Sequence, residues 1–280
     1  MVRRAVPRVT RWVAGWVALW LAARPVTAQT GVLYFAQITD VHLGVLDHDR
    51  VFEQAIEALN AAPFPLACLV VTGDLFADTL AKAEVRAVAT SLLARVRIPV
   101  HVLAGNHDIL EKRAAQDMAL WTNTFGPLAA TADYGGVRFL FVYTEGLFRS
   151  SDDRRFDAFG FLERALREAG SRPVLVFHHS AWFPSYYNNA LWPSWPSDAA
   201  ARWVGILRRT GNVKAVITGH SHRDELHWEG EIPVYVGTPL ARFWGRQPMF
   251  RIYEFREGRL SYRTWTLTDA PPSGERRSSP

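Results

Sequence analysis

Short apolar segments that alternate with helical segments are the feature that most constrains the fold of this chain. From Gly31 onward, seven runs of β-branched and aromatic residues are typical of strands, and most end in Gly, Asp, Asn or His. The runs are VLYFAQIT (32–39), ACLVVT (67–72), PVHVLA (99–104), VRFLFVY (137–143), PVLVFH (173–178), VKAVIT (213–218) and IPVYVG (232–237). Strands that alternate with helices predict an α/β sandwich around a mostly buried sheet.

The segments between these strands have the apolar spacing of helices. The predicted helices span residues 50–61, 80–95, 113–125, 159–169 and 198–210. Near the end of the chain, MFRIYEF (249–255) and RLSYRTWTL (259–267) flank a Glu-Gly pair and predict a closing β-hairpin. Residues 271–280 are polar and rich in Pro and Ser, so we expect a disordered tail there.

The first 28 residues differ from the rest of the chain. Residues 1–11 carry four arginines and no acidic residue, and residues 12–23 carry no charge. Val26-Thr27-Ala28 then places small residues where a signal peptidase cleaves, so residues 1–28 are predicted to be a signal peptide. The apolar run is shorter than the ~20 residues of a membrane-spanning helix, although an uncleaved N-terminal anchor stays open. We therefore expect an exported protein, periplasmic or secreted, that contacts a membrane only if this segment is retained.

The charge balance argues against one class of partner. The chain has 32 Lys and Arg against 27 Asp and Glu, but five of the basic residues lie in the first 28. The remainder is formally neutral and has no appended basic region, so a nucleic acid polymer is not an expected partner. Cys68 is the single cysteine of the chain, which excludes an intramolecular disulfide and a cysteine metal cluster.

Side chains suited to metal binding follow five of the predicted strands. They are Asp40 and His42 (TDVH), Asp74 (TGDL), Asn106 and His107 (AGNHD), His178 and His179 (FHHS), and His220 and His222 (TGHSH). In open α/β sheets the ligand site lies outside the carboxyl ends of the strands, so these side chains should converge. Burying so many ionisable groups together is costly unless cations compensate them. Imidazole and carboxylate ligands without a thiolate favour Mn, Fe, Zn or Co.

The order of these motifs resembles that of the calcineurin-like metallophosphoesterase superfamily, which runs D-x-H, G-D-x-x-D, G-N-H-[DE], H and G-H-x-H. The resemblance covers about residues 31–269 and implies one α/β domain at 29–270, a β-sandwich of two mixed sheets flanked by helices. It also implies two metal ions, both divalent or Fe(III) with a divalent partner. The implied ligands are Asp40, His42 and His222 for one ion, Asn106, His178 and His220 for the other, and Asp74 between them. The first histidine of the FHHS pair usually fills the ligand role, hence His178 and not His179.

The same resemblance makes His107 the histidine that acts on the phosphate without binding a metal. A metal pair can activate a water molecule and clamp an in-line displacement, while His107 protonates the leaving oxygen. The second motif departs from the family pattern, because GDLFAD places its second Asp at position 78, one residue late. That Asp can orient the catalytic histidine in relatives, and here Asp78 and Asp108 are both open as substitutes.

The aromatic segment after FHHS bears on the substrate. Residues 181–197 (AWFPSYYNNALWPSWPS) are interpreted as a loop packed on the domain surface by its own aromatic side chains, as the rim of a binding cleft, or as both. The predicted rim residues are Trp182, Tyr186, Trp192 and Trp195, together with Trp244 further along the chain. Such a wall suits the organic group of a small phosphodiester. Of the other histidines, His101 is expected in the core, and the pattern leaves open whether His48 faces the cleft.

The predicted function is therefore metal-dependent hydrolysis of phosphate esters by activated water, with small organic phosphodiesters as substrates. Two kinds of alternative remain. The same scaffold could serve a phosphomonoesterase, a protein phosphatase or a nuclease. The chain could also be a non-catalytic metal-binding protein.

Overall fold

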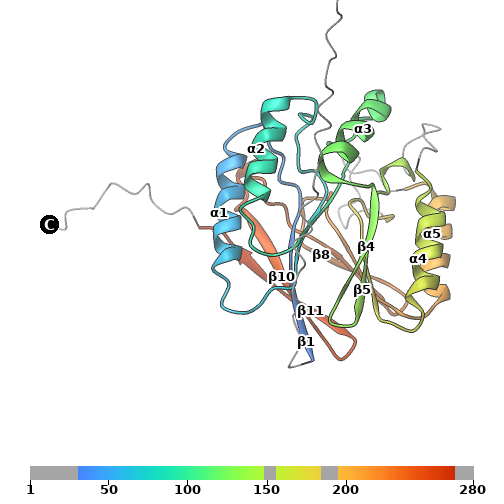
Figure 1. Ribbon diagram of the computed structural model, residues 1–280. Coiled ribbons are helices and arrows are strands. Elements are labelled where there is room, and N and C mark those ends of the chain that lie inside the picture. Colours follow the sequence, from blue (N-terminus) through green and yellow to red (C-terminus); the bar gives the residue numbers. More distant parts are fainter. Residues whose placement is uncertain (1–30, 148–155, 184–194, 269–280) are drawn as a thin grey trace, which may run out of the picture.

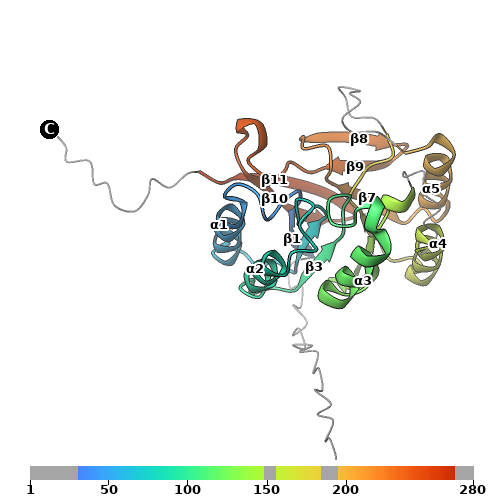
Figure 2. The same ribbon diagram turned by 90° about the horizontal axis from the view of Figure 1, so that it is seen from above.

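The computed structural model describes residues 31–147, 156–183 and 195–268. The predicted signal peptide, the predicted tail and the two rim residues Tyr186 and Trp192 lie outside these ranges. Within them, two mixed β-sheets pack face to face, and helices cover the two outer faces (Figures 1 and 2). The predicted two-sheet architecture is confirmed. None of the helices in these ranges has the length and apolar character needed to span a membrane.

The first sheet has the strand order β11-β10-β1-β2-β3. Its strands are β1 (Val32–Ile38), β2 (Leu69–Thr72), β3 (Val100–Leu103), β10 (Met249–Arg256) and β11 (Arg259–Thr266). The strands β1, β2 and β3 are parallel, whereas β10 runs antiparallel to β1 and forms the predicted hairpin with β11. The helices α1 (His48–Asn60) and α2 (Ala83–Leu93) cover its outer face, and α3 (Ala114–Phe125) joins the same core cluster beyond β3 (Figure 2).

The second sheet has the strand order β4-β5-β6-β7-β9-β8. Its strands are β4 (Ala129–Tyr134), β5 (Val137–Val142), β6 (Val174–Phe177), β7 (Val213–Thr218), β8 (Glu225–Glu229) and β9 (Ile232–Val236). The helices α4 (Ala158–Ala169) and α5 (Ser197–Arg209) cover its outer face, on the opposite side of the molecule from α1 and α2 (Figure 2). Three short 3₁₀ turns complete the described elements: η1 (Glu111–Arg113), η2 (Glu145–Leu147) and η3 (Phe243–Gly245).

An aromatic layer fills the space between the two sheets. Phe35 of β1 stacks on Tyr253 of β10 at 5.0 Å and meets Phe139 of β5 edge-on at 5.1 Å. Phe177 at the end of β6 belongs to the same layer and is fully buried. Because side chains along a strand alternate between its faces, alternate residues of the central strands enter this layer and the others pack toward the helices. The two sheets thus share one core and end at a common edge.

Candidate metal centre

The predicted ligand residues lie just beyond the carboxyl ends of five parallel strands. The first sheet contributes the residues after β1, β2 and β3, and the second sheet contributes those after β6 and β7. Two groups of side chains at this edge have atoms close enough to share a metal ion. The first group consists of Asp40, His42 and His222, and the second group consists of Asp74, His179 and His220 with Asn106 beside them.

The first group joins the β1 end of one sheet to the β7 end of the other. His222 Nε2 lies 3.1 Å from His42 Nε2 and 3.2 Å from Asp40 Oδ1. The second carboxylate oxygen of Asp40 is already used, because it accepts hydrogen bonds from Thr39 Oγ1 at 2.7 Å and from the His220 amide at 3.0 Å. These bonds hold the carboxylate so that Oδ1 faces the two imidazoles.

The second group is built around His179. Its Nε2 lies 3.1 Å from Asp74 Oδ2 and 3.1 Å from Asn106 Oδ1, and His220 Nδ1 lies 2.8 Å from the same Asn106 oxygen. His179 Nδ1 donates to the carbonyl oxygen of Thr72 at 2.8 Å, which fixes the ring and leaves Nε2 directed at the group. Three of the four members, Asp74, Asn106 and His220, are those that the sequence predicted.

The prediction that His178 belongs to this group was wrong. The His178 ring lies among Trp182, Trp195 and Trp203, and its Nδ1 donates to the carbonyl oxygen of Ser180 at 2.9 Å. The cause is strand alternation. Val174 and Val176 of β6 pack toward the helices, while Leu175 and Phe177 face the other sheet. His178 therefore continues the helix-facing series, and His179 reaches the site.

Asp74 lies within reach of both groups. Its Oδ2 is 3.1 Å from His179 and 3.9 Å from His42 Nε2, and its Oδ1 accepts the His107 amide at 2.8 Å. Gly105 makes this approach possible, because a Cβ at that position would overlap Asp74 Oδ1. A Cβ at Gly73 would likewise overlap the His179 ring. The predicted place of Asp74 between the two groups thus agrees with its geometry.

The backbone of the site is strained. Five residues of the two groups adopt left-handed conformations, with φ of 52° for Asp40, 53° for His42, 51° for Asp74, 70° for His220 and 53° for His222. Such conformations cost roughly 1 kcal/mol or more each for residues with a Cβ. They persist only where the surrounding structure enforces them, and their concentration in a few loops marks this edge as the functional one.

Charge keeps the carboxylates ionised although they are buried. Burial by itself raises the pKa of Asp40, but the charge of the neighbouring His222 outweighs it and holds this pKa well below its usual value. For Asp74 burial is outweighed in the same way by His179. Burial lowers the pKa of His42 to about 4 and of His220 to about 3, so both rings are neutral near pH 7 and their nitrogens can act as ligands.

The residues fit a pair of metal ions. Asp40 Oδ1 is a buried carboxylate oxygen that accepts no hydrogen bond from any residue the structure describes, although two imidazole nitrogens lie within 4 Å of it. A cation shared by these atoms would remove the cost of burying the unsatisfied charge. The donor set of imidazoles, carboxylates and one amide is that of borderline divalent metals.

His107 lies beside the first group without belonging to it. Its ring centroid is 5.1 Å from that of His42, and its side chain is 43% exposed, so it borders the open side of the site. Asp78 Oδ1 accepts a hydrogen bond from His107 Nδ1 at 2.8 Å. Burial lowers the pKa of His107, but Asp74 and Asp78 outweigh it, and the net pKa is raised.

Of the two aspartates that the sequence left open as partners of His107, Asp78 is the one that contacts its ring. Asp108 instead accepts the backbone amides of Gly105, Leu75 and Phe76, and it stabilises the loops that carry Asp74 and His107. Burial, reinforced by Asp74, raises the pKa of Asp108 to about 7. The extra residue in GDLFAD therefore does not break the link between this motif and His107.

Among the predicted rim residues that the structure describes, Trp244 alone is exposed beside the site. Trp244 is 68% exposed, and its ring centroid is 5.5 Å from that of His222. Trp182 and Trp195 were predicted wrongly, because they are 6% and 4% exposed and pack around His178. Trp195 Nε1 also donates to Ser180 Oγ at 3.2 Å. These two side chains belong to the core beneath α5.

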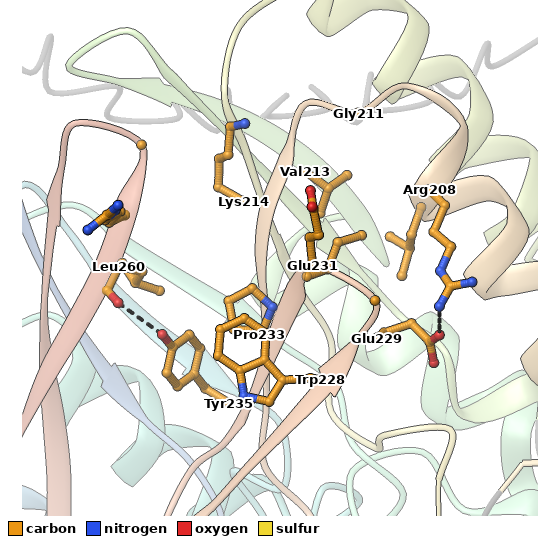
Figure 3. A pocket seen from close by; sticks show the side chains of 15 residues that line it. Arg208, Gly211, Val213, Lys214, Trp228, Glu229, Glu231, Pro233, Tyr235 and Leu260 are labelled. Atoms are coloured by element: carbon orange, nitrogen blue, oxygen red, sulfur yellow. Dashed lines mark hydrogen bonds and ion pairs between the residues drawn. The ribbon is translucent and has the colours of Figure 1, made fainter.

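A cavity of about 690 Å³ lies at the opposite end of the strands (Figure 3). It is lined by the beginning of β7, the end of α5, the β8–β9 hairpin and the turn between β10 and β11. Arg208 pairs there with Glu229, and the Tyr235 hydroxyl donates to the carbonyl oxygen of Leu260 at 2.9 Å. None of its lining residues belongs to the two groups, so this cavity lies apart from the candidate metal centre.

The fold and the site have the arrangement of a metallophosphoesterase, in which two sandwiched sheets present histidine and aspartate at the ends of their strands. The chain belongs to the calcineurin-like phosphoesterase family, whose family model matches residues 33–224. It is similar to the bovine (Bos taurus) serine/threonine-protein phosphatase CPPED1, with 28% identity over 69% of this chain and 70% of the relative. It is also similar to the glycerophosphodiester phosphodiesterase GpdQ of Enterobacter lignolyticus, with 23% identity over 68% of this chain and 71% of the relative.

A solved structure shows the same fold. The dimetal phosphatase from Danio rerio superimposes with a TM-score of 0.62 at 13% identity, over 85% of this chain and 99% of that one. At 13% sequence identity this similarity shows a shared fold and nothing more.

Proposed function

We propose that this protein hydrolyses small organic phosphodiesters with the help of two metal ions. The observation that carries the choice of substrate is Trp244, which presents a largely exposed indole beside His222 at the open side of the site. An exposed indole on a strained backbone offers a flat apolar surface to an organic group of the substrate. The curated relative GpdQ, named as a glycerophosphodiester phosphodiesterase, supports this choice, whereas CPPED1, named as a protein phosphatase, supports the alternative.

Each side chain of the site has a role in this proposal. Asp40, His42 and His222 hold one ion, while Asn106, His179 and His220 hold the other, with Asp74 shared between them. The metals, which we expect among Mn, Fe, Zn and Co, supply a Lewis acid and lower the pKa of water. His107 supplies the proton for the leaving oxygen. Because Asp78 accepts from Nδ1, the transferable proton of His107 is the one on Nε2.

Hydrolysis of two chromogenic esters by metal-reconstituted protein tests the proposal. We expect kcat/KM for bis(p-nitrophenyl) phosphate to exceed that for p-nitrophenyl phosphate, and we expect activity to disappear after chelation and return with added metal. His107→Ala should keep its metals and lose about 10²–10⁴-fold in rate, with a smaller loss for better leaving groups. Preference for the monoester or for a phosphopeptide would favour a phosphatase. A fully metallated protein that cleaves no ester would favour a non-catalytic role.

We also propose that the protein is exported and that residues 1–28 are its signal peptide. The basic, apolar and small-residue order of this segment supports the proposal. Mass spectrometry of the native protein should find a mature chain that begins near Gln29. Membrane-bound protein with an intact Met1–Ala28 segment would show that this segment is an anchor instead.

A further inference from the structure

The segment that carries Trp244 is tied to the metal centre by hydrogen bonds on both sides. The amides of Leu240 and Ala241 donate to the carbonyl oxygens of Thr39 and Asp40 at 2.9 and 3.0 Å. After the η3 turn, the Arg246 guanidinium donates to the carbonyl oxygen of His222 at 2.7 Å. The η3 turn is therefore anchored on both sides to the loops that carry the first group.

His48 adds a link in the middle of this segment. It is 1% exposed, and its Nδ1 lies 3.0 Å from the carbonyl oxygen of His42. A carbonyl can only accept, so Nδ1 carries the hydrogen and Nε2 has a free lone pair. That lone pair accepts the amide of Arg242 at 3.2 Å. A single neutral imidazole thus connects the backbone of His42 to the residue that precedes the η3 turn.

The η3 turn needs such support. Trp244 has a φ of 57°, which is unfavourable for a residue with a Cβ. The Phe243 ring stacks on the His222 ring with an interplanar angle of 9°. It also meets the rings of His42 and His48 edge-on, with centroids 5.1 and 4.9 Å apart. The orientation of Trp244 therefore depends on contacts that its neighbours make with the first group and with His48.

We propose that His48 is a positioning residue, whose Nε2 holds the Arg242 amide and so fixes Trp244 at the open side of the metal centre for substrate binding. The part that concerns substrate rests on the proposed function; the part that concerns the turn does not. Loss of the Nε2 acceptor leaves the metal ligands and His107 in place, because none of them bonds to that nitrogen. The effect should therefore fall on KM and not on kcat.

Two substitutions separate the two ends of the His48 ring. In His48→Asn the amide can still donate to the His42 carbonyl oxygen but has no acceptor that reaches Arg242. In His48→Gln the longer side chain can place its oxygen near the position of Nε2. We expect His48→Asn to raise KM for bis(p-nitrophenyl) phosphate about fivefold with kcat nearly unchanged, as for the loss of one hydrogen bond. His48→Gln should keep KM close to the wild-type value. The effect should be absent when Trp244→Ala is already present, because both substitutions act through the same side chain.

Hydrogen exchange of the full-length protein measures the stability of the η3 turn and its flanking residues without any substrate. The Arg242 amide should be protected in the wild-type protein, and His48→Asn should raise exchange within residues 240–246 while metal content stays at the wild-type level. His101→Asn is the matched control, since His101 is a half-buried histidine of β3 with one hydrogen bond, to Tyr134. That variant should lower stability without raising exchange in residues 240–246.

Each contrary outcome overturns a stated part of the proposal. An unprotected Arg242 amide in the wild-type protein would refute the link itself, even if His48→Asn fails to fold. Loss of metal from a folded His48→Asn variant would assign His48 to metal retention. Raised exchange with unchanged KM would refute the effect on substrate. Absence of hydrolysis by the wild-type protein would count against the proposed function and leave the exchange result intact.

Discussion

His178 and His179 are neighbours in sequence but lie in two different regions of the molecule. His179 enters the polar site at the edge between the sheets, and His178 enters an aromatic core between the second sheet and its helices. Both side chains are fully buried. Burial lowers the pKa of His178 to about 3, whereas for His179 the charge of Asp74 outweighs burial and raises the pKa well above its usual value. The comparison teaches that the face of the strand from which a ring projects, and not its burial, separates a ligand histidine from a packing histidine.

The largest expected effect concerns Asp74, the carboxylate that distinguishes the two regions. Asp74→Asn removes the charge within reach of both groups, so metal binding should weaken at both and turnover should be nearly abolished. Elemental analysis and hydrolysis of bis(p-nitrophenyl) phosphate measure the two effects. Asp133→Asn, an exposed carboxylate on β4, is the control and should leave both unchanged. An active Asp74→Asn protein with two tightly bound metals would contradict the assignment.

The paired histidines provide the most direct test of the comparison. His179→Asn should lose metal from the second group and about 10²-fold or more in rate, as expected for a ligand. His178→Asn should keep both metals and lower the free energy of unfolding by about 1–3 kcal/mol, because it disturbs a buried polar contact. Metal analysis and denaturant unfolding distinguish the two variants. If His178→Asn lost metal while His179→Asn retained it, the roles would be reversed.

A smaller effect is expected from Asp78. Its carboxylate helps to raise the pKa of His107, so the protonated form persists to higher pH. Asp78→Asn lowers that pKa, and the alkaline limb of the pH–kcat profile should move to lower pH, with about tenfold loss of rate on that limb. Metal content should not change. Asp47→Asn, which removes an exposed carboxylate near α1, should leave the limb in place. An unmoved limb in Asp78→Asn would mean that Asp78 acts on His107 by geometry alone.

The smallest effect on catalysis is expected from the tryptophans, and here the two regions should differ in kind. Trp244→Ala removes an exposed side chain, so KM should rise severalfold with little change in kcat or stability, as for uniform binding. Trp195→Ala creates a cavity beside His178 and should lower the free energy of unfolding by about 3–5 kcal/mol with KM unchanged. If Trp195 lined the substrate site instead, Trp195→Ala would raise KM with little loss of stability.

Most of the architecture and most of the site could be predicted from the sequence. Four of the five strands that carry the motifs are short, apolar and fully or largely buried, so their pattern is strong. The residues after all five converge because parallel strands end at one edge. The edge strands β4 and β8 were missed. Their sequences, AATADY and ELHWE, are half-exposed and have few β-branched residues, so pairing with β5 and β9 and not local propensity makes them strands.

The errors within the site have separate causes. The exchange of His178 for His179 could have been avoided, because the alternation in Val174–Phe177 already separates the two faces of β6. The sequence left Asp78 and Asp108 open as the partner of His107, and it could not decide between them because the choice depends on how a loop folds. The contact of His48 with Arg242, on which its proposed role rests, was equally inaccessible, because the two residues are 194 positions apart in the sequence. The burial of Trp182 and Trp195 follows from their side of the second sheet, which an aperiodic segment does not reveal.

The pairing of β10 with β1 decides where this chain can be cut. Val32 lies opposite Arg256, so the first strand of the domain is completed by one of the last. The region matched by the family model ends at residue 224, before β8, β9, β10 and β11. A fragment trimmed to that region would retain the ligand residues but expose an unpaired edge of β1 beside Asp40, and it would remove the Phe243 ring that covers His222. Expression of the family-matched segment by itself should therefore yield an aggregating polypeptide, and a useful boundary lies after Leu267.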